Sequence, residues 1–292
     1  MQIALFGKSL PDENIRYIQQ IIKGLEMNNV EIVFYEKLYN IVKDKVVLKN
    51  AIRVFNTHEE IKDTVSYLFS IGGDGTLLDT LSYIRDSGIP VLGINLGRMG
   101  FISSISKERI DSAINQLVNN KFKLDKRTLI NIKTSEDIFG DLNYALNEVS
   151  FYRKSPLTML KIQAFVDDDF VNSYWADGLI ISTPTGSTAY SLSNGGPIIL
   201  PGSQNFVITP IATHNLTVRP IVIPDSSKIR IKVASRVKDF YVNLDSRSVQ
   251  VNSSYEFVIK REEFKINLLQ LEDESYFRTI REKLLWGLDI RN

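Results

Sequence analysis

Five consecutive residues, Gly72-Gly73-Asp74-Gly75-Thr76, place one carboxylate among three glycines directly after an apolar run at residues 65–71. Glycines let a backbone turn sharply and approach a ligand closely, and ligands of open α/β sheets collect where strands end. The pattern predicts that this backbone contacts the phosphates of a ligand and that Asp74 is held beside it. The alternative is that Asp74 only caps a helix, since such residues often precede one.

Residues 177–197 run from an apolar strand into hydroxyl side chains and glycines. Small side chains expose backbone N–H groups and hydroxyls add hydrogen-bond partners, so this loop can hold sugar hydroxyls, amides or phosphate oxygens. Ser, Thr, Gly and Pro also form ordinary surface loops, and the composition leaves both interpretations open. The neighbouring side chains of Asn147 and Glu148 can bind a ribose diol or simply lie on the surface.

The elements that position these motifs change in type along the chain. Up to about residue 120, strand patterns at 3–6, 30–34, 65–71 and 90–94 alternate with helical spacing at 15–25 and from Thr76 to 85. From about residue 122, short alternating segments such as Ile229–Val233 predict antiparallel strands. Helical spacing returns at residues 276–285.

The sequence therefore predicts an α/β half plus an all-β half. The expected parts are an N-terminal open parallel α/β sheet domain over residues 1–121, a mostly antiparallel β domain over 122–275, and a C-terminal helical tail over 276–292 that packs back on the first domain. Two packed halves leave a crevice, where ligands preferentially bind.

Composition excludes several classes of protein. The 292 residues carry 35 basic and 34 acidic side chains, so no dominant nucleic-acid footprint is expected. No apolar run has membrane-spanning length, and the first residues lack a secretory signal pattern. With no cysteine and two histidines, His58 and His214, a dedicated zinc site is not expected. Neither Gly-x-Gly-x-x-Gly nor a P-loop occurs, nor does Gly-x-Ser-x-Gly. A cytoplasmic protein without membrane or nucleic-acid partners is expected.

The order of the motifs resembles the NAD kinase family over most of the chain. The matching segments are Gly72 to Thr76, Asn95 to Phe101, Asn147-Glu148, Asp177 to Pro197, Pro210 to Pro220 and Arg281 to Gly287. The first segment alone also resembles lipid kinases and phosphofructokinases, which are not expected to carry the long segment at 177–197.

The resemblance implies transfer of the γ-phosphoryl group of ATP to the adenosine ribose 2′-hydroxyl of NAD, with Asp74 as general base. It implies Mg²⁺ or another divalent cation held mainly by ATP, with no metal ligand set in the chain. The phosphate contacts implied are Gly72, Gly73, Gly75 and Thr76. The NAD-binding residues implied are Asp74, Gly75, Phe101, Asn147, Glu148, Asp177, Thr188, Ala189, Tyr190, Ser191, Leu192, Ser193 and Ala212. A homodimer or homotetramer built through the β halves is also implied.

Some positions depart from the family pattern or vary within it. Asp79 stands where many members have a basic residue, and a carboxylate there should not hold a phosphate directly. Trp175, Asp245 and Arg247 are possible ligand contacts; Trp175 can alter selectivity near the nicotinamide, and Arg247 can reach a phosphate or pair with a surface carboxylate. A lipid or sugar kinase and a catalytically silent NAD-binding sensor are the alternative functions.

Overall fold

The computed structural model describes residues 1–49, 52–97, 100–234 and 239–287. Arg98 and Met99, which belong to the segment expected at 95–101, lie outside the described residues. The chain folds into two compact units, the first made of residues 1–126 and 266–292 and the second of residues 127–265.

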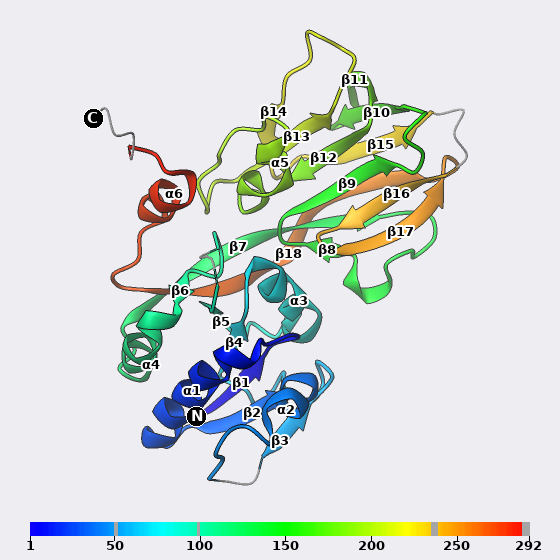
Figure 1. Ribbon diagram of the computed structural model, residues 1–292. Coiled ribbons are helices and arrows are strands. Elements are labelled where there is room, and N and C mark those ends of the chain that lie inside the picture. The colour runs from blue at the N-terminus through cyan, green and yellow to red at the C-terminus, as the bar shows by residue number, and fades with distance from the viewer. Residues whose placement is uncertain (50–51, 98–99, 235–238, 288–292) are drawn as a thin grey trace. The chain divides into compact units, whose positions relative to one another are not determined.

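The first unit is a parallel sheet with helices (Figure 1). Its strand order is β18-β5-β4-β1-β2-β3, with β6 beside β5, and the described pairs are parallel. The strands are β1 (Gln2–Phe6), β2 (Glu31–Tyr35), β3 (Arg53–Phe55), β4 (Tyr67–Ile71), β5 (Val91–Asn95), β6 (Ile105–Ser106) and the last part of β18 (Glu256–Leu271). The helices are α1 (Ile15–Met27), α2 (Glu36–Val42), α3 (Asp74–Ile84), α4 (Ile110–Val118) and α6 (Tyr276–Leu284).

Apolar spacing explains why these segments are helical and which faces they bury. In α1 the residues Ile18, Ile21, Ile22 and Leu25 recur at helical spacing and are buried. Helices α1 and α4 pack closely, since a Cβ atom on Gly24 would lie 2.8 Å from the Ile114 side chain. The same cluster of buried side chains includes strands β1, β2, β4 and β5, so the helices cover the sheet that ends at the glycine turn.

The second unit packs antiparallel sheets face to face around one hydrophobic core. One sheet has the order β14-β13-β12-β9-β16-β17, and strands β11, β10, β15 and the first part of β18 pair in that order in the other. The remaining bounds are β7 (Phe122–Lys133), β8 (Tyr144–Ala145), β9 (Glu148–Arg153), β10 (Leu160–Val166), β11 (Asp169–Ala176), β12 (Gly178–Ser182), α5 (Tyr190–Ser193), β13 (Asn205–Ile211), β14 (Ile221–Pro224), β15 (Ile229–Val233), β16 (Asp239–Leu244) and β17 (Arg247–Asn252).

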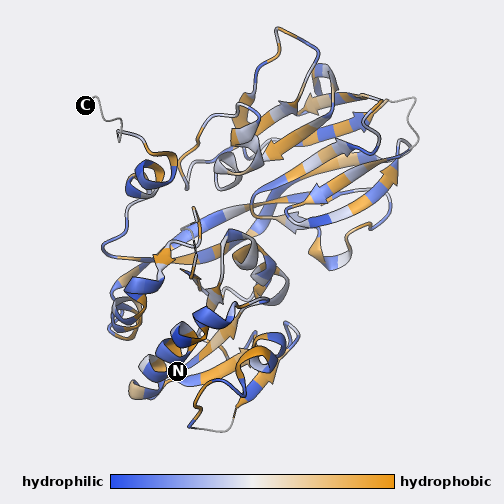
Figure 2. Cartoon of the chain, viewed as in Figure 1, coloured by the Kyte–Doolittle hydropathy of each residue, from blue (hydrophilic) through white to orange (hydrophobic). Residues whose placement is uncertain are grey.

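Strand patterning in this unit is alternating, as half-buried antiparallel strands require. In β15 the residues Ile229, Ile231 and Val233 are buried, whereas Arg230 and Lys232 are only partly so. Figure 2 shows hydrophobic and hydrophilic residues alternating along the strands of these sheets.

The fold class predicted from the sequence is confirmed: a parallel α/β sheet, an antiparallel β part and a C-terminal helix. Several element bounds differ from the prediction by one or two residues; α3, for example, begins at Asp74 rather than at Thr76. Asp74 and Gly75 are thus the first two helical residues. Among the described residues, no helix is long and apolar enough to cross a membrane.

Candidate functional site

The Asp74 carboxylate is bound by the backbone of a loop that follows β5. Oδ2 accepts a hydrogen bond from the N–H of Phe101 at 2.8 Å, and Oδ1 accepts one from the N–H of Ser103 at 2.9 Å. The Ile102 N–H lies 3.3 Å from Oδ1. No side-chain hydrogen bond caps α3, whose N-cap is Gly73. Asp74 is therefore oriented toward the 101–103 loop and does not act as a helix cap.

This loop approaches Asp74 so closely that Gly100 has no room for a side chain. A Cβ atom there would lie 1.7 Å from Asp74 Oδ1. The Ser103 hydroxyl fixes the loop from the other side by donating to the Gly72 carbonyl oxygen at 2.8 Å. Residues 100–103 and the glycine turn thus form one hydrogen-bonded unit around a half-buried carboxylate.

The turn itself presents open backbone at the end of β4. Gly72 has a φ of 151°, in the region that favours glycine, and a Cβ atom there would clash with Thr76. By contrast, Cβ atoms on Gly73 and Gly75 would meet nothing within 4 Å. Backbone N–H groups at a helix start are suited to anions. The first turn of α3 can therefore accept phosphate groups without steric obstruction.

In the second unit, Asn147 and Glu148 lie at the start of β9 beside the long 177–197 segment. Ser182 is paired with Glu148 across the sheet, and the Thr183 N–H donates to the Asn147 carbonyl oxygen at 2.9 Å. A Cβ atom on Gly186 would lie 2.1 Å from that same oxygen. The glycine at 186 is thus required for the loop to pack against the Asn-Glu pair.

Asp245 holds the backbone of this pair from the turn between β16 and β17. Its carboxylate accepts hydrogen bonds from the N–H groups of Leu146 and Asn147, each at 2.8 Å, and of Glu148 at 3.2 Å. Asp245 itself adopts a left-handed φ of 50°, which an aspartate tolerates better than most residues. The carboxylate of Asp245, which the sequence predicts as a possible ligand contact, is therefore bound by protein backbone.

Glu148 is an unusual carboxyl because its environment disfavours charge. Its Oε2 atom is buried and has no hydrogen-bond partner among the described residues. Burial raises the pKa of Glu148 to about 8, and the nearby Asp245 charge acts in the same direction. Burial also raises the pKa of Asp245, whereas its three N–H donors and Arg247 oppose that shift. Near neutral pH the geometry favours a protonated Glu148 that can donate a hydrogen bond.

Arg247 follows the same turn and binds main-chain oxygens. Its guanidinium donates to the carbonyl groups of Leu142 and Tyr144, and it lies 5.9 Å from the Tyr144 ring centroid. These contacts tie the turn to the segment that leads into Asn147, so Arg247 supports the same backbone as Asp245.

Asp177, Trp175 and Ala212 lie at the opposite end of β12 from Glu148, about 17 Å along the strand. The Asp177 carboxylate forms an ion pair with Arg153 at 2.8 Å. Trp175 is 49 % exposed, and its carbonyl accepts a hydrogen bond from the His214 N–H. Ala212 has a φ of 45° and is exposed. The structure thus places the predicted NAD residues of this unit in separate groups.

A third group is the short helix α5 and the turn before it. Thr188 and Ala189 precede the helix, and its residues are Tyr190, Ser191, Leu192 and Ser193. Ser191 is buried and shares a 2.8 Å hydrogen bond with Thr209, which anchors α5 on β13. Tyr190 is 42 % exposed. Its ring is therefore available to a ligand, whereas the Ser191 hydroxyl is engaged by the sheet.

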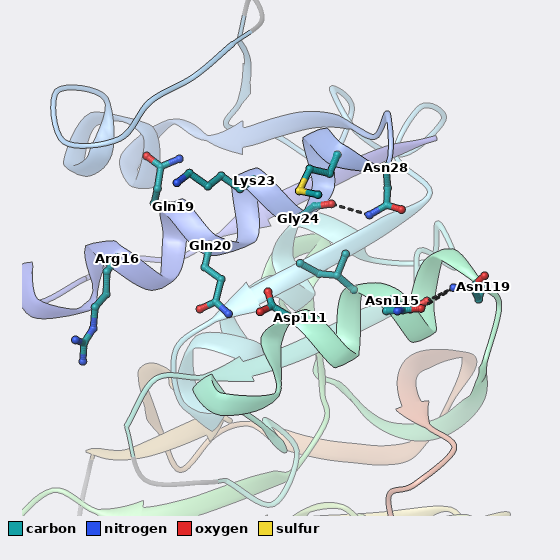
Figure 3. Close-up of a pocket in the computed structure, with 11 residues that line it drawn as sticks. Arg16, Gln19, Gln20, Lys23, Gly24, Asn28, Asp111, Asn115 and Asn119 are labelled. Atoms are coloured by element: carbon teal, nitrogen blue, oxygen red, sulfur yellow. Dashed lines mark hydrogen bonds between the residues drawn. The ribbon is translucent and has the colours of Figure 1, made fainter.

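A surface groove elsewhere in the first unit contains none of the predicted site residues. It has a volume of about 940 Å³ and lies between α1 and α4, lined by polar side chains that include Gln20, Lys23 and Asp111 (Figure 3). Among the residues that the structure describes, no three His, Cys, Asp or Glu side chains gather to hold a metal ion.

Residues 3–122 match the ATP-NAD kinase N-terminal domain, and residues 146–271 match the ATP-NAD kinase C-terminal domain. The chain belongs to the NAD kinase family. It is 40 % identical to an NAD kinase of Cytophaga hutchinsonii over 293 residues and 42 % identical to one of Flavobacterium psychrophilum over 294 residues, covering all of each chain.

Solved structures of the family agree with the fold. Yeast NADH kinase complexed with NADH superposes with a TM-score of 0.86 at 25 % identity, covering 98 % of this chain and 88 % of that one. An NAD kinase from Archaeoglobus fulgidus in complex with ATP gives 0.74 at 25 % identity, covering 98 % and 99 %. The predicted family resemblance is confirmed.

Several residues of this NAD kinase could not be picked out from the sequence. Ser103 binds Asp74 and Gly72, and Thr183 donates its hydroxyl to the Leu146 carbonyl oxygen. Arg127 is buried and donates to the Thr185 hydroxyl at 3.1 Å. Thr183 and Thr185 lie inside the predicted 177–197 segment, but no local pattern distinguishes Ser103 or Arg127.

Proposed function

We propose that this chain transfers the γ-phosphoryl group of ATP to the adenosine ribose 2′-hydroxyl of NAD, giving NADP, with Asp74 as the general base. The observation that carries the proposal is the Asp74 carboxylate itself. It is fixed by the N–H groups of Phe101 and Ser103 and stands next to the open backbone of Gly73 and Gly75. A base and a phosphate-binding helix start are thereby brought together.

In the reaction, the 2′-oxygen forms a bond to the γ-phosphorus, ADP leaves, and the hydroxyl proton passes to Asp74. A hydroxyl is a poor nucleophile until a positioned group accepts its proton, and such base catalysis contributes roughly 10²–10⁴-fold. The backbone of Gly72, Gly73 and Gly75, together with Thr76, would hold the phosphates in line for attack.

A divalent cation, Mg²⁺ or a similar ion, would be held mainly by the triphosphate oxygens. In support of this assignment, the Asp74 carboxylate is directed at backbone N–H groups of residues 101 and 103. When bound, the cation neutralises charge on the transferring phosphoryl group.

The NAD site would draw on the groups of the second unit. Asn147 and a protonated Glu148 suit a ribose diol, since one supplies an amide and the other a hydroxyl donor and a carbonyl acceptor. The exposed Tyr190 ring can stack on a base. Asp177, Thr188, Ala189, Ser191, Leu192, Ser193, Ala212 and Phe101 complete the proposed set, and Trp175 would affect the choice between NAD and NADH. We assign Asp245 and Arg247 to positioning the Asn147-Glu148 backbone.

Assembly and location are also proposals. Tyr152, Ile221 and Val222, on strands of one antiparallel sheet, are 36–43 % exposed. Burying such residues between copies would support a homodimer or homotetramer built through the β halves. Sedimentation showing a monomer at working concentration would remove that proposal. The absence of cysteine fits a cytoplasmic location.

The deciding experiment is NADP formation from NAD, ATP and Mg²⁺, with NADH as a parallel acceptor and Asp74→Asn as the comparison. Asparagine keeps the size of the side chain but cannot accept the proton, so we expect turnover to fall roughly 10²–10⁴-fold while NAD binding persists. The substitution also replaces one acceptor oxygen by NH₂, so the Tm of the variant is measured beside its activity. No product from the wild type despite NAD binding would favour the silent sensor. Product from a lipid or hexose but not from NAD would favour the other kinases.

A further inference from the structure

Lys8 and Asp79 form an ion pair that the proposed reaction does not yet use. Lys8 follows β1 after Gly7, and its Nζ atom lies 2.8 Å from Oδ2 of Asp79 on α3. The two side chains are 42 % and 24 % exposed. The pair is therefore accessible to a ligand on the surface of the first unit.

The pair lies beside the glycine turn. Strands β1 and β4 are parallel neighbours, with Phe6 opposite Ser70, so both strands end at the same edge of the sheet. A Cβ atom on Gly7 would lie 3.1 Å from the Ile71 carbonyl oxygen, directly before Gly72. The chain thus leaves β1 in contact with the backbone that opens the turn, and Lys8 is the next residue.

Helical spacing places Asp79 on the phosphate-facing side of α3. Asp79 follows Gly75 by four residues, so the two positions share one helix face about 6 Å apart. The space around Gly75 on this face is open. An ammonium group paired with Asp79 therefore lies about one helical turn from the place where phosphates would bind.

Pairing with Lys8 explains how a carboxylate can lie on this face of α3. A carboxylate on this face would repel the negative charges of a triphosphate, and pairing with an ammonium group cancels that repulsion. Lysine carries a compact charge with three donors on a flexible stem, so it can move from a carboxylate to a phosphate oxygen without rearranging the backbone.

We propose that Lys8 binds the phosphate oxygens of the donor nucleotide at the glycine turn, and that its pairing with Asp79 holds the ammonium there before the nucleotide arrives. The site assigned to ATP phosphates under the proposed function is the basis for this inference. Lys8 is then a residue that determines affinity for the donor and has no role in binding NAD.

The test measures ATP affinity in Lys8→Met by calorimetry without NAD, together with the KM values for ATP and for NAD. We expect the Kd and KM for ATP to rise about tenfold or more, with the NAD KM unchanged within about twofold. Lys8→Arg should retain most of the ATP affinity, and the loss in Lys8→Met should shrink at high salt. The matched control is Lys62→Met, which removes another lysine of the first unit, one that is paired with Glu59 at 2.6 Å; it should bind ATP as the wild type does.

Two further variants separate phosphate binding from a plain surface ion pair. Asp79→Asn keeps the cation but removes the partner that positions it, so ATP affinity should fall, by less than in Lys8→Met. The double variant Lys8→Met with Asp79→Asn should bind ATP better than Lys8→Met alone, because the unpaired carboxylate is gone. Wild-type ATP affinity in Lys8→Met would overturn the inference. Failure of the proposed function would look different: no NADP from the wild type, with ATP binding still dependent on Lys8.

Discussion

The Asp245 carboxylate accepts a hydrogen bond from the backbone N–H of Glu148, while the Glu148 carboxyl keeps one buried oxygen without a partner among the described residues. Asp245 and Glu148 are thus held close together, but only the Asp245 carboxylate is satisfied by hydrogen-bond donors. Glu148 can lower its cost of burial by taking up a proton. This arrangement links the stability of the second unit to pH.

Glu148→Gln should make the stability of the folded state less sensitive to a rise in pH. The pKa of Glu148 is raised from 4.5 to about 8 on folding, so the folded state binds more protons between these values. The stability that Glu148 contributes is fully present below its unfolded-state pKa. It is lost as the pH rises through its folded-state pKa, by at most about 1.4 kcal/mol per pH unit. We expect the Tm of the wild type to fall from pH 5 to pH 8 more steeply than that of the variant, measured by thermal unfolding.

The control for this measurement is Glu263→Gln, which changes an exposed carboxyl in β18. Its Tm should follow the wild-type curve at each pH. Parallel curves for Glu148→Gln and the wild type would show that Glu148 ionises normally in the folded protein.

Gly100→Ala tests the close approach of the 101–103 loop to Asp74. A methyl group would overlap Asp74 Oδ1, so the carboxylate must move and lose its N–H donors from Phe101 and Ser103. We expect kcat to fall roughly 10²–10⁴-fold, as if the base were removed, with a lower Tm. The comparison is Gly97→Ala, where the nearest atom would lie at an ordinary 3.7 Å and the Tm should stay near that of the wild type. Wild-type turnover in Gly100→Ala would contradict the role of Asp74 as a fixed base.

Local periodicity was enough to predict most elements. The apolar spacing that ends at Leu25 marks α1, and the alternation of Ile229 and Ile231 marks β15, because each pattern reports which face of one element is buried. The start of α3 is harder to predict from the sequence. Two glycines around Asp74 suppress helix propensity, and the helix nevertheless begins at Asp74, whose side chain is held by a distant loop.

The partners of site residues could not be predicted in this way. Asp74 meets Ser103, 29 residues away, and Asp245 meets Asn147, 98 residues away. Such contacts depend on strand order, which a single sequence does not reveal. The same holds for β18, one continuous strand that contributes to both units although a charged run at residues 260–263 interrupts its apolar pattern.

Arg247→Met should separate a structural role of this arginine from phosphate binding. The guanidinium donates to the Leu142 and Tyr144 carbonyl groups, and hydrogen bonds that involve a charged group contribute roughly 1.5–3 kcal/mol. We expect a lower Tm and a raised KM for NAD, with the KM for ATP near that of the wild type. Arg219→Met is the matched control, because the Arg219 guanidinium donates to nearby carbonyls of its own loop, those of Leu216 and Val218. An unchanged Tm with weaker ATP binding would instead assign Arg247 to a phosphate.

Gly75→Ala should give a protein that folds well and binds its donor badly. Gly75 is the second residue of α3, and an added Cβ atom would meet no atom within 4 Å beyond its chain neighbours and the backbone of its own helix. Alanine favours a helix over glycine by roughly 0.5–1 kcal/mol, so the Tm should hold or rise. The same methyl group would occupy the space through which phosphates reach the backbone, and the KM for ATP should increase about tenfold. A stable variant with wild-type KM for ATP would show that the donor phosphates bind away from this helix start, and would therefore weaken the assignment of Lys8 as well.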